Sequence, residues 1–150
     1  MGTMLNEKDR AGLVSRLQQL DAGMSPRWGK MTCPKMLAHL TDALLMTYGD
    51  MDVPGKWSPM RYFPLNYLII HVIPFPKGAP TAPQLIARTP GADEAFEQER
   101  DRLTALIHRF GDEAERTSWP VHPIFGSMSR EDWAVLAFRH SDHHLRQFGV

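Results

Sequence analysis

The chain has 150 residues, of which 17 are basic and 17 are acidic, and it contains one cysteine. A chain of this length buries an adequate core as one domain, so we predict a single domain over residues 1–150. Because the charges cancel, nothing indicates nucleic acid or an anionic membrane as a partner. The lone Cys33 excludes an internal disulfide and is typical of a reducing compartment.

No segment has the character of a signal or a membrane anchor. The first ten residues, Met1–Arg10, are polar and contain no apolar signal core. The longest apolar run, around Tyr67–Phe75, is too short to span a bilayer and is interrupted by Pro74. We therefore expect a soluble cytoplasmic protein with no membrane partner.

Two amphipathic helices are predicted in the first third of the chain. Asn6 is a suitable N-cap for a helix that runs to about Ala22. Thr32 is a suitable N-cap for a second helix, with Pro34 in its first turn, where the missing N–H costs little. Apolar residues continue this second helix at helical spacing until Gly49, which is typical of a helix end.

The middle of the chain contains one further helix pattern and a proline-rich segment. Ser58 and Pro59 are suited to begin a third helix, which we expect to be buried and to run from Met60 to about Val72. Residues 67–73 also resemble a strand, but no other segment offers a matching partner. We therefore predict an all-helical bundle, followed by a proline-rich loop over residues 74–91.

The last third of the chain carries two further helix patterns. Apolar and charged residues alternate at helical spacing from Ala92 to Phe110. Ser129, with Asp132 three residues later, has the pattern of a capping box at the start of a final helix over residues 130–147. The intervening segment, residues 117–128, contains two X-Pro pairs and is expected to be a loop.

The final helix carries three of the seven histidines within five residues. His140 and His144 are four residues apart, which places both imidazoles on one helix face together with Trp133. Two such imidazoles can share one divalent transition metal. His143 lies about 80–100° from the centre of that apolar face, so we rank it second.

A third ligand is expected from another helix, because two ligands rarely hold a metal and buried imidazoles without partners are costly. His39 lies on the predicted inward stripe of the second helix and is our candidate; His71, His108 and His122 compete with it. Histidine pairs on helices are more often solvated or hydrogen-bonded than metal-bound. Neither the Glu-x-x-His pattern of di-iron bundles nor the H-E-x-x-H pattern of zinc proteases is present.

Other polar residues near these patterns have ordinary interpretations. We expect Cys33 to be a buried apolar residue rather than a nucleophile, and Asp42 to be a solvated carboxylate rather than a partner of His39. Gln147 either hydrogen-bonds a ligand or packs at the bundle end. Arg146 is expected at the surface, with binding of an anionic substrate as the alternative.

Three strings carry a resemblance to a known family: Trp28–Thr32, Met36–Leu40 and His140–Gly149 (HSDHHLRQFG). The segments His122–Gly126 and Ser129–Trp133 match the same pattern. The chain resembles the DinB-like (YfiT-like) metal-binding four-helix superfamily, in particular a subgroup of unknown function.

The resemblance implies an up-down-down-up four-helix bundle with a long crossover loop, often assembled as a homodimer. It implies a divalent transition metal, zinc or nickel, held by His39, His140 and His144. This is the same set that the helix pattern favours. Whether His143 or His122 joins as a fourth ligand stays open at this point.

Two functions are compatible with this site. Characterised members of the superfamily include transferases and isomerases that use low-molecular-weight thiols, which implies a metal-dependent transferase or hydrolase that activates a thiol or water for a small-molecule substrate. The alternative is a non-catalytic, metal-stabilised module acting in protein–protein interaction or stress response. Three protein ligands with an open position favour catalysis, whereas four favour a structural site.

Overall fold

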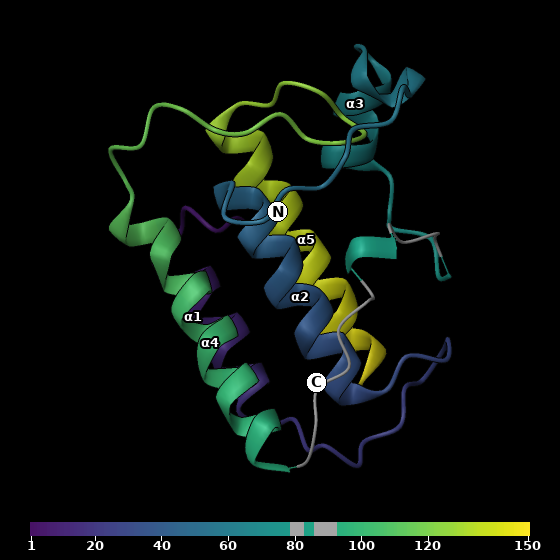
Figure 1. Ribbon diagram of the computed structural model, residues 1–150, viewed down its shortest axis with the longest axis vertical. Coiled ribbons are helices and arrows are strands. Elements are labelled where there is room, and N and C mark those ends of the chain that lie inside the picture. The colour runs from purple at the N-terminus through teal and green to yellow at the C-terminus, as the bar shows by residue number, and fades with distance from the viewer. Residues whose placement is uncertain (79–82, 86–92) are drawn as a thin grey trace.

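Four long helices lie side by side in the computed structural model, which describes residues 1–78, 83–85 and 93–150 (Figure 1). They are α1 (Glu7–Leu17), α2 (Cys33–Tyr48), α4 (Asp93–Asp112) and α5 (Arg130–Gln147). The described residues contain no β-strand, only one isolated bridge between His122 and Gly126. The predicted all-helical fold is thus confirmed.

The helices run up-down-down-up, with α1 parallel to α5 and α2 parallel to α4 (Figure 1). Near the end of α1, Arg16 pairs with Asp142 in the second half of α5 at 2.7 Å. At the end of α2, the Tyr48 hydroxyl donates to the carbonyl oxygen of Leu106 in the second half of α4 at 2.8 Å. The parallel neighbours require the long crossover between α2 and α4.

Side-chain caps begin α1, α2 and α5 where the sequence predicts them, and a glycine ends α2. Asn6 accepts from the N–H of Asp9, and Thr32 accepts from the N–H of Lys35. Ser129 and the residue three positions later form both hydrogen bonds of a capping box. Gly49 ends α2 with φ of 77°, a left-handed conformation that favours glycine.

The core lies between the four helices and is centred on α2. Twelve of the sixteen α2 residues are buried, because this helix packs against both α4 and α5. The largest fully buried side chains are Trp133, Phe110, Met4, Leu13, Leu17, Met36, Leu37, Leu40, Ile70, Leu103, Ile107 and Leu145. The polar residues His39, Thr41, Asp42 and Thr47 of this helix are therefore enclosed by the bundle.

The predicted third helix is wrong in extent and in burial. Instead of one helix over residues 60–72, the chain forms a 3-10 turn (η1, Pro59–Arg61), one α-turn (α3, Leu65–Tyr67) and a π-turn (η2, Leu68–Val72). Pro64 interrupts the span, since proline lacks the amide N–H that a continuous helix needs. Most of this segment's apolar side chains are exposed.

The first helix ends earlier than expected, at Leu17 rather than about Ala22. After it, the side chain of Asp21 accepts from the N–H of Gly23 at 2.8 Å. This local hydrogen bond favours a turn over further helix. The predicted loop over residues 74–91 lies partly outside the described residues; within it, the turn η3 (Pro83–Leu85) lies against α2.

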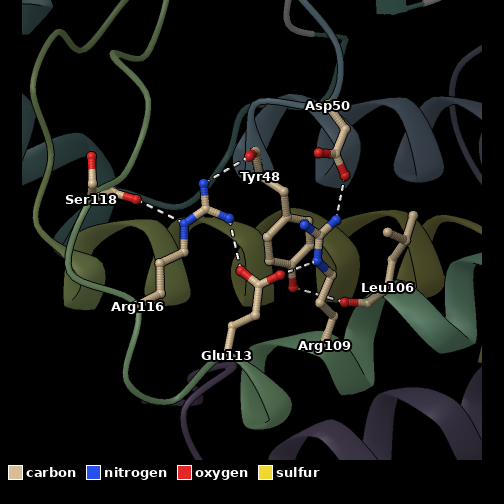
Figure 2. Close-up of polar contacts among 7 residues, drawn as sticks. All are labelled: Tyr48, Asp50, Leu106, Arg109, Glu113, Arg116 and Ser118. Atoms are coloured by element: carbon tan, nitrogen blue, oxygen red, sulfur yellow. Dashed lines mark hydrogen bonds and ion pairs between the residues drawn. The ribbon is translucent and has the colours of Figure 1, made fainter.

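A cluster of charged residues fixes the end of the bundle where α2 and α4 both finish (Figure 2). Glu113 pairs with Arg109, and with Arg116 at 2.7 Å. Arg116 also donates to the backbone oxygen of Tyr48 at 2.9 Å, while Arg109 pairs with Asp50. The loop that leads to α5 thus starts from an anchored position.

No helix in the described part of the chain has the length and apolar character needed to cross a membrane.

Candidate metal centre

Three histidines from two helices meet inside the bundle. His39 comes from the buried face of α2, and His140 and His144 come from successive turns of α5. One ring nitrogen of each lies within 4.8 Å of the other two, and Nε2 of His39 is 2.9 Å from Nε2 of His140. The structure therefore brings together the three residues that the sequence singles out.

Hydrogen bonds fix the orientation of two of these rings. The Nδ1–H of His39 donates to the carbonyl oxygen of Leu85 in η3 at 2.9 Å. The Nδ1–H of His144 donates to Oε1 of Gln147 at 2.8 Å. Because both partners are oxygens that only accept, each Nδ1 carries the proton and each Nε2 presents a lone pair. This is the arrangement that metal-ligating histidines usually have.

The short contact between His39 and His140 identifies a position suited to a cation. Two ring nitrogens at 2.9 Å repel each other if both present lone pairs, so His140 must supply an N–H or a cation must attract both. The three rings pack edge to face, with centroids 4.8–4.9 Å apart. Three imidazoles are a good donor set for zinc or nickel, so the residues fit such a metal.

Burial keeps all three imidazoles neutral. It lowers the pKa of His39, lowers that of His144 to about 3, and lowers that of His140 well below its ordinary value. The neighbouring rings lower the pKa values of His140 and His144 further, because an imidazolium beside another imidazolium is disfavoured. Neutral imidazole is the form that binds a metal, so the site does not have to lose protons first.

The two candidates for a fourth ligand lie outside this cluster in the described part of the chain. The ring of His143 packs edge to face on Trp28, with 5.7 Å between centroids. Nδ1 of His122 accepts from the backbone N–H groups of residues 124 and 125 at 3.0 and 3.1 Å. Nδ1 of His122 therefore stabilises the turn in which the residue lies.

The remaining competitors also have other roles. Nε2 of His71 pairs with Oδ1 of Asp132 at 2.7 Å and so links η2 to the first turn of α5. His108 is exposed on α4 and lies outside the cluster. Cys33 is fully buried, as expected, and burial raises the pKa of its thiol to about 12.

Two features of the site were not predicted. Asp42 is buried rather than solvated, and its negative charge raises the pKa of His39 against the larger effect of burial. The expected surface position was wrong because α2 is enclosed on nearly all sides. The Leu85 carbonyl that orients His39 has no signal in the sequence, since any residue supplies a backbone oxygen. Gln147 serves as a hydrogen-bond partner, one of the two predicted alternatives.

Comparison with known proteins agrees with this architecture. The family model of the DinB superfamily matches residues 7–148, from the first residue of α1 to just beyond the last residue of α5. No curated protein and no solved structure matches the chain. The matched region contains all four long helices and the three clustered histidines. The chain therefore belongs to the DinB superfamily.

Proposed function

We propose that this protein is a metal-dependent enzyme that activates a thiol or water for reaction with a small-molecule substrate, as a transferase or a hydrolase. The observation that carries the proposal is the convergence of three neutral imidazoles, His39, His140 and His144, on one position. Two of them are held with Nε2 inward by acceptors on Nδ1. Zinc and nickel both suit this donor set.

The number of protein ligands favours catalysis over a purely structural role. Structural zinc sites usually have four protein ligands, whereas catalytic sites have three and an open position. Within the described residues, the cluster has three members. A metal in such a site lowers the pKa of a bound water or thiol and so supplies a nucleophile at neutral pH. The reducing cytoplasm that we expect from Cys33 contains thiols of low molecular weight.

The chain's own residues prepare the site for that chemistry. Burial keeps the ligands neutral, and Leu85 and Gln147 hold two of the rings with the proton on Nδ1 and Nε2 free to bind. A preorganised site of this kind loses little free energy in ordering its ligands when the reaction begins.

A second candidate function rests on where the ligands come from. His39 belongs to α2, and His140 and His144 belong to α5, so a bound metal would cross-link two core helices. A metal-stabilised module that binds another protein, as a monomer or a homodimer, would use the site in this way. The two candidates differ in one requirement: the enzyme needs a coordination position that a thiol or water can occupy, whereas the structural module does not.

Metal content tests the ligand set. Alanine variants of His39, His140 and His144 should each lose the metal, because two imidazoles compete poorly with water and chelators. Alanine variants of His143 and His108, one next to the site and one far from it, are matched controls and should retain it. Full occupancy in all three ligand variants would contradict the proposal.

Cobalt substitution tests the open position. Cobalt(II) can replace zinc in protein sites, and its absorption spectrum depends on the ligands that it binds. Adding 2-mercaptoethanol to the cobalt protein should produce a sulfur-to-cobalt charge-transfer band if a coordination position is free. An unchanged spectrum at saturating thiol would favour the structural module over the enzyme.

A further inference from the structure

A second concave site lies along α5, beside the three clustered histidines. It is a pocket of about 450 Å³, and its lining includes Trp28, Phe75, Lys77, Arg139, His143 and Arg146. Three of the α5 residues of this lining, Arg139, His143 and Arg146, follow one helical stripe, at i, i+4 and i+7. That stripe is offset by one residue, about 100°, from the stripe of the metal-site histidines. None of the three clustered histidines lines the pocket, but it adjoins their site: the ring centroid of Phe75 is 6.3 Å from that of His140, and that of His143 is 5.3 Å from that of His144.

The charges around this pocket do not balance. Three cationic side chains line it, whereas Asp142 is the one carboxylate in its lining. Asp142 is paired twice, with Arg146 at 3.0 Å and with Arg16 at 2.7 Å. Its single negative charge is therefore already shared, and the pocket has an excess of positive charge.

Arg139 is held in place without an acidic partner in the described part of the chain. Its guanidinium donates to the carbonyl oxygens of Ile69, Ile70 and Ile73, at 3.0 Å for the first and 2.6 Å for the last. It also lies over the ring of Phe75, at 5.1 Å from the centroid. Carbonyl oxygens fix the orientation of a guanidinium but leave its net charge in place.

Aromatic rings form the walls beside these charges. The ammonium of Lys77 lies over the ring of Trp28, at 4.6 Å from the centroid. The indole Nε1–H of Trp28 is buried and has no acceptor among the described residues. Phe75 and Phe138 complete an apolar surface. Apolar rings beside cationic groups suit a ligand that has both an apolar body and an acidic group.

We propose that this pocket binds an organic anion with a planar apolar body, such as an aromatic carboxylate or sulfonate. The volume is within the range of small-molecule sites, and the combination of apolar walls with a few charged groups is typical of them. The rings would contact the ligand's apolar body, and Lys77 and Arg146 would contact its acidic group. Binding requires no metal, because none of the three clustered histidines lines the pocket.

A matched pair of probes tests the requirement for charge. Naphthalene-1-sulfonate should bind to the metal-free protein and shift the indole N–H signal of Trp28 in a nitrogen–proton correlation spectrum, with Trp28→Phe providing the assignment. Its neutral isostere, naphthalene-1-sulfonamide, should bind about tenfold more weakly or not at all. Raising the salt concentration should weaken binding of the sulfonate, since exposed charges are screened.

Variants of Lys77 locate the site. Lys77→Gln should weaken sulfonate binding about threefold to tenfold, the loss typical of one exposed charge, and Lys77→Arg should retain most of it. Lys8→Gln removes an exposed lysine on α1 and is the matched control. The same affinity for both probes, or no effect of Lys77→Gln, would overturn the proposal. Loss of sulfonate binding in a folded His39→Ala variant would also overturn it, because the anion would then occupy the metal centre.

Discussion

Oε1 of Gln147 lies 2.8 Å from Nδ1 of His144, one turn further along α5. The amide nitrogen of the same side chain donates to the backbone oxygen of Trp28 at 2.8 Å. The second bond fixes which end of the amide faces the histidine, because the carbonyl of Trp28 accepts only from nitrogen. Gln147 therefore ties the orientation of His144 to the segment that precedes α2.

Replacing Gln147 should weaken metal binding without unfolding the protein. In Gln147→Leu, Nδ1 of His144 loses its acceptor and the ring loses its fixed orientation. We expect zinc affinity to fall about 10- to 100-fold, as for other partners of metal-ligating histidines. Competition with a chromophoric chelator measures the affinity. Gln18→Leu, at the exposed end of α1, should leave it unchanged; equal affinity for a folded Gln147→Leu would refute an orienting role.

Metal removal should lower the melting temperature. A ligand that binds only the native state stabilises it by about 3–4 kcal/mol when present at a few hundred times its dissociation constant. A chelator at pH 7.5 should therefore lower the melting temperature of the wild-type protein. The metal-free His39→Ala variant is the control and should not respond. If the wild-type melting temperature stays constant after the metal is shown to be gone, the cross-linking module loses its support.

The sequence predicts the elements whose signals are local. Asn6, Thr32 and Ser129 act as caps in the structure because capping depends on residues within one turn. The spacing of His140 and His144 suffices to place them on one face. The hydrogen bond from His39 to the Leu85 carbonyl and the burial of Asp42 depend on how distant segments pack. No local sequence pattern predicts such packing.

The segment over residues 60–72 shows the limit of composition as a guide. Its apolar content predicts a buried helix, yet Phe63 is 80% exposed and Tyr67 is 52% exposed. The four long helices already enclose the core, and Pro64 prevents a fifth helix of the expected length. Among the residues of these three turns, Ile70 alone is buried.

Two leucine variants test this division between core and periphery. Leu103 on α4 is fully buried, whereas Leu65 on α3 is 43% exposed. Leu103→Ala should lower the free energy of unfolding by about 2–5 kcal/mol, through lost burial and the cavity left behind. Leu65→Ala should lower it by less than about 1 kcal/mol. Urea unfolding measures both values, and comparable losses would mean that the segment over residues 60–72 belongs to the core.

His122 should make stability depend on pH. Its ring packs on Trp133 with 5.1 Å between centroids, and burial lowers its pKa to about 4, against about 6.5 for an ordinary histidine. The native state keeps this ring neutral, so as pH falls the unfolded state binds the proton first. Its contribution is therefore fully present above pH 6.5 and is lost as pH falls towards about 4, by up to about 3 kcal/mol.

The comparison with His122→Asn isolates this contribution. The asparagine oxygen can accept from the same backbone N–H groups but does not titrate. The other buried histidines titrate in both proteins, so their effects cancel in the difference. Urea unfolding at pH 7 and pH 5 should show a larger loss of stability for the wild type than for the variant. If the two proteins lose the same amount, His122 becomes protonated without leaving its place, and the turn over residues 122–126 is more open to water than its burial indicates.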